Sequence, residues 1–331
     1  MTEAQNLPGR RSDVSSPNGY DPRQWAVHTA YSDPGPYADL LLAVPAQIEK
    51  LSAVARNLII HYRASGLKLP EETRDDIDAR WIAAILDLDQ QRHPQPLDVE
   101  RDPISKVQGC CRDHSLFSVA VLRQHGVPAR LRYGFAHYFH QDYGADHVIV
   151  EIWLSEEMRW LRFDPEVGEP MERLTTPQDI PHGPDAPFTT AAECWLAYRA
   201  GTIDPRTYGA GPGVGVGGAW YMQGAVFYDA AFRAGHELLV WDTWPGMSSP
   251  DGVTTAEARL ADELSALIVA ADSGDADAER QLIERMRSDP TVGPGTSVRT
   301  MSPRGDPART TDLTRRPGTR GTRSTGRRQA Q

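Results

Sequence analysis

The feature that most constrains the fold of this chain is an apolar helix pattern that stops abruptly and leads into three strand patterns. Residues 111–125 are largely apolar, and Gly126 is suited to end a helix in the left-handed conformation. Val127-Pro128 then prevents the helix from continuing. Segments rich in Val, Ile, Tyr, Phe and Trp follow at residues 129–136, 146–153 and 158–164. The pattern predicts an α+β fold in which one helix packs on an antiparallel meander.

Helical patterns flank this block on both sides. Apolar residues at three- and four-residue spacing predict helices over 45–64 and 71–88 before it, and over 190–199 and 254–286 after it. We therefore expect five regions: a disordered lead-in at 1–24, a helical N-terminal part of the core at 25–103, the central core at 104–168, a helical and aromatic extension at 169–290, and a disordered basic tail at 291–331.

The charge balance argues against a nucleic-acid-binding protein. The chain has 35 Lys and Arg against 45 Asp and Glu, a formal charge of −10. Residues 293–331 hold nine arginines and two aspartates, so this tail carries +7 and the first 292 residues carry −17. A nucleic-acid binder usually presents a basic stripe on its folded part, whereas here the basic residues gather in a stretch without an apolar face. Deleting residues 293–331 is expected to leave folding and activity unchanged.

The location of the protein is predicted from what its sequence lacks. No run approaches the 18 or so apolar residues that span a bilayer, and the first residues have no apolar segment typical of a secretory signal. Three cysteines, Cys110, Cys111 and Cys194, do not suggest a disulfide framework. We expect a cytoplasmic protein with reduced thiols and no membrane association.

A glycine-rich stretch and an aromatic segment in the C-terminal half are both expected to be structural features of the fold and not ligand sites. The stretch 209–218 contains G-x-G-x-x-G, but without a preceding strand or a βαβ unit it predicts a loop rather than a dinucleotide site. Aromatic residues are dense between Trp220 and Trp244, and we expect most of them to fill a core, with a substrate groove as the alternative.

The central block also holds three residues that together could perform nucleophilic catalysis. Cys111 begins the apolar helix, where unpaired N–H groups and the helix dipole favour a thiolate. His147 opens the second strand and could hold and return the proton of the thiol. Asp164 closes the third strand, and in an antiparallel pair it would lie near His147 and orient its ring.

These residues stand within four short motifs that resemble the core of the transglutaminase-like superfamily. The motifs are Gly109-Cys110-Cys111-Arg112-Asp113, then Gly126-Val127-Pro128-Ala129-Arg130, then Asp146-His147, and finally Trp160 to Asp164-Pro165. The resemblance covers about residues 104–168. It implies a papain-like core with a Cys-His-Asp triad formed by Cys111, His147 and Asp164.

The same resemblance decides between neighbouring candidates. It selects Cys111 rather than Cys110 as the nucleophile, which leaves Cys110 and the mid-helix Cys194 as packing residues. Gln108 is a candidate for stabilising the oxyanion, together with the backbone N–H of Cys111. The chain departs from the family where it reads His147-Val148-Ile149-Val150-Glu151, because the family often has an aromatic residue at the position of Ile149.

A cluster of histidines offers an alternative chemistry. His137, His140, Asp142 and His147 are close in sequence and could bind zinc, but His137 and His140 should face opposite sides of an extended strand. We therefore expect neither a metal nor another cofactor.

The function predicted from the sequence is acyl transfer by a cysteine enzyme. Cys111 would attack an amide or peptide and form a thioester, which water or an amine would then release. The expected substrate is a peptide, a protein or a small amide. The alternative is a noncatalytic binding scaffold that retains the transglutaminase-like fold.

Overall fold

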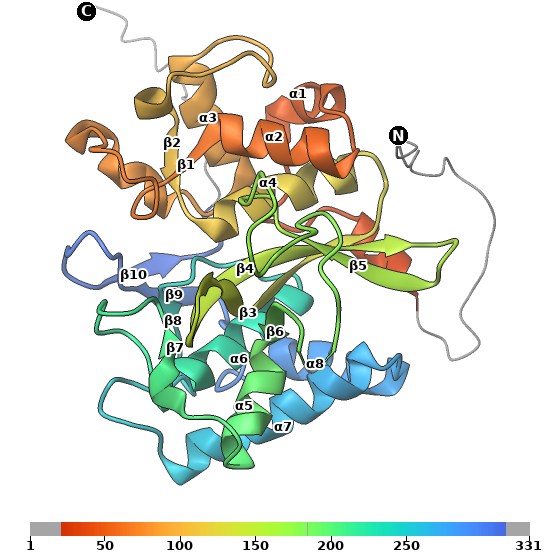
Figure 1. Cartoon of the computed structure of the whole chain (residues 1–331), viewed down its shortest axis with the longest axis vertical. Coiled ribbons are helices and arrows are strands. Elements are labelled where there is room, and N and C mark those ends of the chain that lie inside the picture. The colour runs from red at the N-terminus through yellow and green to blue at the C-terminus, as the bar shows by residue number, and fades with distance from the viewer. Residues whose placement is uncertain (1–20, 184, 316–331) are drawn as a thin grey trace, which may run out of the picture.

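A sheet of five strands lies at the centre of the fold, with helices on both sides of it (Figure 1). The computed structural model describes residues 21–183 and 185–315. The strand order is β5-β4-β3-β6, and the short strand β7 pairs with the N-terminal end of β4. All pairs are antiparallel except β4 with β7. The strands are β3 (Ala129–His140), β4 (Tyr143–Leu154), β5 (Arg159–Phe163), β6 (Phe188–Thr190) and β7 (Tyr208–Gly209).

The central helix α4 (Cys111–Gln124) packs against β3 and β4. Gly126 follows α4 with φ 74°, the left-handed conformation that ends a helix, as expected from the sequence. The Ser115 hydroxyl donates to the carbonyl oxygen of Val148 at 2.8 Å and so ties the first turn of α4 to β4. The expected helix and meander are therefore present, and the predicted α+β class is confirmed.

The N-terminal helices cover α4 on the side away from the sheet (Figure 1). Two of the predicted helices here differ from the structure. The stretch 45–64 becomes a shorter helix and a strand that pairs in parallel with β2, and residues 71–88 divide into a 3-10 helix at Glu71–Asp78 and a separate α-helix. In the first stretch, pairing of residues 59–61 with β2 has overridden local helix preference. The elements are α1 (Ala38–Ala43), α2 (Ile48–Leu58), β1 (Ile59–His61), α3 (Ile82–Arg92) and β2 (Val107–Gly109).

The C-terminal helices form a second group, joined to β3 through α5 and α6. Thr190 caps α5, since its hydroxyl accepts the N–H of Glu193. The single helix expected at 254–286 is two helices, because Gly274 at φ 90° breaks it. The helices are α5 (Ala191–Arg199), α6 (Ala219–Arg233), α7 (Thr255–Asp272) and α8 (Ala276–Ser288).

The aromatic segment between Trp220 and Trp244 belongs mainly to the core. Five of its rings are buried, while the Tyr221 hydroxyl donates to Asp146 at 2.8 Å. The glycine-rich stretch before α6 is a loop that follows the two-residue strand β7, and no βαβ unit surrounds it among the described residues. The buried rings are Phe227, Tyr228, Phe232, Trp241 and Trp244.

The basic tail contradicts the expectation of disorder over much of its length. Strands β9 (Ser297–Thr300) and β10 (Arg309–Asp312) form an antiparallel sheet with β8 (Asp242–Thr243). The Thr300 hydroxyl donates to Asp242 at 2.7 Å and accepts from Arg80 at 2.6 Å. The segment is ordered by this polar bonding to buried charges together with Val298, which is buried in the main core. The remainder of the tail (316–331) and most of the expected lead-in (1–20) lie outside the described residues.

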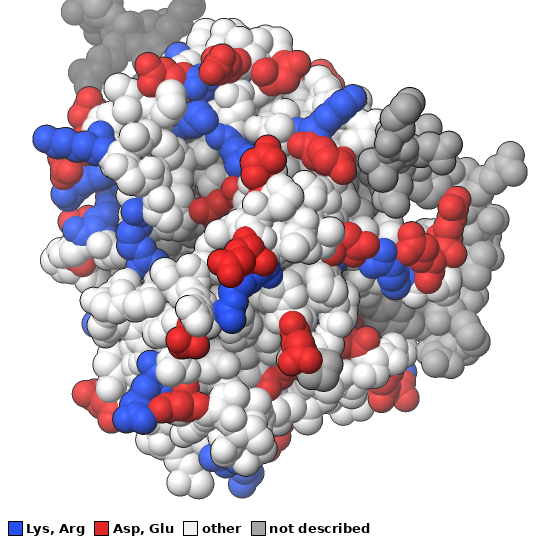
Figure 2. All heavy atoms as spheres, viewed as in Figure 1, with Lys and Arg blue, Asp and Glu red and all other residues white. Residues whose placement is uncertain are grey.

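The surface carries charges of both signs. On the face seen in Figure 2, Lys and Arg are interspersed with Asp and Glu instead of forming a patch of one sign. Across residues 21–183 and 185–315, no helix has both the length and the apolar composition needed to cross a bilayer.

Candidate functional site

The nucleophile candidate Cys111 stands at the first position of α4, where side chains pack closely against Gly109. Gly109 ends β2, and a Cβ atom there would stand 2.9 Å from both Asp113 Oδ2 and Ile59 Cγ2. The space that glycine leaves lets Asp113 turn back and accept the N–H of Cys110 at 2.8 Å. Arg112 donates to the other oxygen of Asp113 at 2.8 Å. Asp113 and Arg112 thus act as a helix-start carboxylate and its ion pair.

His147 and Asp164 meet at the end of the β4–β5 pair. Nε2 of His147 lies 2.8 Å from Asp164 Oδ2. Asp164 directly follows β5, and its carboxylate also accepts the Tyr138 hydroxyl at 2.6 Å and the backbone N–H of Glu166 at 2.9 Å. With Asp164 on Nε2, Nδ1 is the ring nitrogen left to face the thiol.

The structure brings Cys111 to this pair. The Cys111 thiol, a ring nitrogen of His147 and a carboxylate oxygen of Glu166 all lie within 4.8 Å of one another. The site is almost closed to solvent, since Cys111 is 6% exposed, His147 3% and Asp164 2%. Such burial strengthens the electrostatic interactions among the three groups. The arrangement can therefore transfer a proton between sulfur and imidazole.

The electrostatics of the site differ from the expectation based on the start of the helix. Contact with the Cys110 thiol and burial raise the pKa of Cys111 well above its usual value, and the carboxylates of Glu166 and Asp146 raise it further. Burial alone would lower the pKa of His147, but Asp164 and the same two carboxylates outweigh it, so the pKa of His147 is raised. The resting thiol is therefore protonated, and it faces a base stronger than an ordinary imidazole.

Asp164 stays charged in this buried position. Burial would raise its pKa, but the charge of His147 and hydrogen bonds from His147, Tyr138 and the Glu166 N–H lower the pKa of Asp164 below its usual value. A charged, four-times-bonded carboxylate fixes the ring orientation of His147.

The other sequence candidates are placed as follows. The side-chain amide of Gln108 donates to the Pro70 carbonyl and to the Thr73 hydroxyl, both at 2.8 Å, so its two N–H groups are engaged in the 3-10 helix region. The N–H of Cys111, at the first helical position, has no acceptor within the helix. Cys110 and Cys194 are buried thiols without disulfide partners.

Two residues at the site were missed by reasoning from the sequence. Tyr138 lies beyond the strand predicted at 129–136, in the part of β3 that the apolar pattern did not include, and nothing in the sequence distinguishes its hydroxyl. Glu166 lies three residues after the end of β5, in the turn that its N–H closes on Asp164, and no signal in the sequence marks it.

The histidine cluster considered as a zinc site does not assemble. His137 Nε2 lies 3.2 Å from Thr189 Oγ1, and His147 turns to Asp164. In the part of the chain that the structure describes, only Cys111, His147 and Glu166 bring three possible metal-ligand atoms together.

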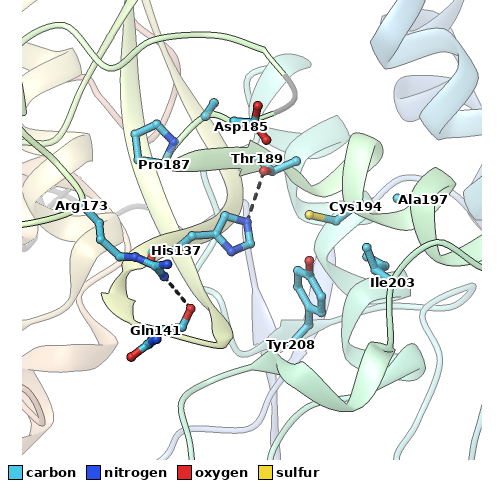
Figure 3. Close-up of a pocket in the computed structure, with 11 residues that line it drawn as sticks. His137, Gln141, Arg173, Asp185, Pro187, Thr189, Cys194, Ala197, Ile203 and Tyr208 are labelled. Atoms are coloured by element: carbon cyan, nitrogen blue, oxygen red, sulfur yellow. Dashed lines mark hydrogen bonds between the residues drawn. The ribbon is translucent and has the colours of Figure 1, made fainter.

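A separate cavity lies beside the C-terminal end of β3. It has a volume of about 490 Å³, and its walls include His137, Arg173, Thr189 and Tyr208 (Figure 3). None of Cys111, His147 and Asp164 lines it. This cavity is therefore distinct from the candidate active site.

The chain is similar to a known protein family over part of its length. Residues 71–165 match the family model described as the transglutaminase-like superfamily. A crystal structure from Cytophaga hutchinsonii, provisionally described as a cysteine protease, is similar at 14% identity with a TM-score of 0.29. The match covers 46% of this chain and 42% of that chain. No curated protein matches the chain.

Proposed function

Because residues 71–165 form a transglutaminase-like superfamily domain, we propose that the chain is a cysteine-dependent acyl-transfer enzyme acting on an amide or peptide. The observation that carries the proposal is the 2.8 Å bond from His147 to Asp164 beside the thiol of Cys111. A nucleophile, a base and an orienting carboxylate are the parts that such chemistry needs.

The reaction follows from the protonation states at the site. As Cys111 Sγ attacks the acyl carbon, Nδ1 of His147 takes the thiol proton. The same proton is given to the leaving amine when the C–N bond breaks, which leaves a thioester on Cys111. Water or an amine then attacks the thioester and passes its proton to His147, and the thiol is restored as it takes that proton back. The N–H of Cys111 is the oxyanion donor in this scheme.

Alkylation of Cys111 tests the proposal without a known substrate. The rate of iodoacetamide modification would be followed by peptide mass spectrometry near neutral pH in the wild type and in His147→Ala. Removing the base should slow modification of Cys111 by about 10²-fold, while Cys194 serves as the internal reference thiol. Equal rates in both proteins would contradict the mechanism and favour the noncatalytic scaffold.

The acceptor is decided by a second assay. A peptide library would be incubated with the enzyme, with and without hydroxylamine, and the products analysed by mass spectrometry. Hydroxamates appear where an amine can enter the site, and free acids alone appear where water is the acceptor. Cys111→Ala must abolish both products.

A further inference from the structure

Glu166 is a buried acceptor at the active site for which the proposed reaction has no use. Its carboxylate lies within 4.8 Å of both the Cys111 thiol and a ring nitrogen of His147. Although the residue as a whole is half-buried, Oε2 is buried and has no hydrogen-bond partner among the described residues. Leaving a buried charged oxygen unpaired is costly, so such an atom calls for a partner that the chain itself does not supply.

The backbone fixes Glu166 in this position. Its N–H donates to Asp164 Oδ1 at 2.9 Å, and that of Val167 donates to the same oxygen at 3.4 Å. The turn after β5 is therefore built on the carboxylate that orients His147. The backbone of Glu166 is therefore positioned by hydrogen bonds to a residue of the site itself.

The donors at this point form a zinc-type ligand set. A thiolate, an imidazole nitrogen and a carboxylate oxygen are the three ligand types that Zn²⁺ takes from proteins, with water often in the fourth position. Zinc-bound histidines usually donate their second N–H to a carboxylate, which holds the ring and raises its basicity. Asp164 already does this at Nε2 of His147, which leaves Nδ1 as the ligand atom.

We propose that Cys111, His147 and Glu166 bind a Zn²⁺ ion that reversibly blocks the nucleophile. Binding displaces the thiol proton to solvent, and the resulting thiolate and the Glu166 carboxylate together balance the charge of the ion. In a tetrahedral site the three ligand atoms stand about 3.2–3.6 Å apart. Side-chain movements of about 1 Å would bring the three atoms, now within 4.8 Å of one another, to these distances. The metal would occupy the sulfur that the acyl group needs, making the two states mutually exclusive.

Metal binding is measured on the tag-free full chain, without any substrate. Titration calorimetry with ZnCl₂ gives the affinity, and CoCl₂ reports sulfur ligation through a thiolate-to-metal charge-transfer band in the near ultraviolet. Glu166→Gln should weaken Zn²⁺ binding about tenfold or more, whereas the matched Glu169→Gln, three residues away and exposed, should not. Cys111→Ser should abolish the charge-transfer band, and Cys110→Ser should keep it.

Circular dichroism and the urea midpoint establish that each variant is folded before it is titrated. Tight Zn²⁺ binding that survives Glu166→Gln, or a cobalt spectrum that survives Cys111→Ser, would place the metal elsewhere and overturn the inference. So would the absence of binding in the wild type. The inference shares two residues with the proposed function, but the two fail separately. A reactive Cys111 without metal binding rejects only the zinc site, and metal binding at an unreactive Cys111 rejects only the acyl transfer.

Discussion

At the scale of single residues, the position of the histidine depends on a hydroxyl that lies outside the proposed triad. Tyr138 donates to the same oxygen of Asp164 that bonds His147, and it is 4% exposed. Its ring also contacts the imidazole edge-on, with centroids 6.0 Å apart. Tyr138 is therefore a positioning residue that limits rotation of the Asp164 carboxylate.

Replacing Tyr138 with Phe removes this hydroxyl and keeps the ring. A hydrogen bond to a charged group is worth about 1.5–3 kcal/mol. Because Tyr138 acts on the thiol only through Asp164 and His147, we expect about half of this free energy to reach the reaction, so that Tyr138→Phe lowers the rate of Cys111 alkylation by about 3- to 10-fold. The matched control is Tyr228→Phe, which loses a buried 2.8 Å bond to the Asp242 carbonyl. A control that slows alkylation as much as Tyr138→Phe would show a general structural effect instead.

At the scale of the element, the start of α4 requires a glycine. A methyl group at Gly109 would press on Asp113 and on Ile59 of β1, both at 2.9 Å. The glycine of the Gly-x-Cys motif is thus needed for packing of β1, β2 and the helix start, not for a left-handed backbone.

We expect Gly109→Ala to destabilise the protein by about 1–3 kcal/mol and to slow Cys111 alkylation, because the extra carbon must displace the first turn of α4. Urea unfolding and the alkylation rate measure the two effects. Gly224→Ala is the control, since that glycine lies within α6 and a Cβ there meets only the end of Met247 at 3.3 Å. Loss of equal size in both variants would contradict the argument.

The strand pair of the tail leads to a second prediction at this scale. Truncation after residue 292 removes β9 and β10, together with the Thr300 hydroxyl that contacts buried Arg80 and Asp242. Leaving that ion pair without its partner should cost about 1–3 kcal/mol, measured as a lower urea midpoint. Truncation after residue 315, which removes none of the described contacts, is the control. An unchanged urea midpoint after truncation at residue 292 would support the sequence-based prediction that the tail does not contribute to folding.

At the scale of the whole molecule, a buried ion network joins the sheet to the C-terminal helices. Glu151 of β4 lies at its centre and is 1% exposed. It pairs with three arginines, one of which also reaches α6 and α7. The network consists of Arg130, Arg132, Arg162 and Arg233 with Glu151, Asp229, Asp272 and Glu279.

We expect Glu151→Gln to destabilise the protein by about 3–5 kcal/mol, because three buried guanidinium groups lose the carboxylate that they share. Glu157→Gln is the matched control. Its carboxylate pairs with Arg159 at the surface, 47% exposed, where a salt bridge is worth about 0–1 kcal/mol. Chemical denaturation at neutral pH gives the free energy of unfolding of each variant. Comparable losses of stability in the two would mean that burial does not determine how much these ion pairs stabilise the fold.

The same network makes the fold sensitive to acid. The surrounding arginines hold the pKa of Glu151 well below its usual value despite burial, and that of Asp272 is lowered in the same way. The folded state therefore binds fewer protons than the unfolded chain, whose glutamates titrate near about 4.3. This stabilisation is present above that pH and is lost as the pH falls.

We expect the urea midpoint of the wild type to fall between about pH 5 and about pH 3, and to fall less steeply in Glu151→Gln, which lacks one of the linked groups. Parallel slopes in the two proteins would show that Glu151 does not contribute.

The sequence by itself determined the parts of the protein that depend on local order along the chain. Apolar spacing with a glycine and proline stop is enough to specify α4 and the meander, and the motif order was enough to indicate the transglutaminase-like superfamily. Cys111, His147 and Asp164 were singled out because a helix start and two strand ends bring them to one edge. Their catalytic roles remain a proposal.

Only the tertiary structure decided what depends on pairing between distant segments. Residues 59–61 form a strand because β2 lies beside them, and the tail is ordered because Thr300 meets Asp242 and Arg80. Glu166 and Tyr138 enter the site through register and packing, and the pKa of Cys111 is raised by burial and by neighbours that local sequence does not reveal. The physical reason is common to all of these: the free energies involved come from contacts that exist only after the chain has folded.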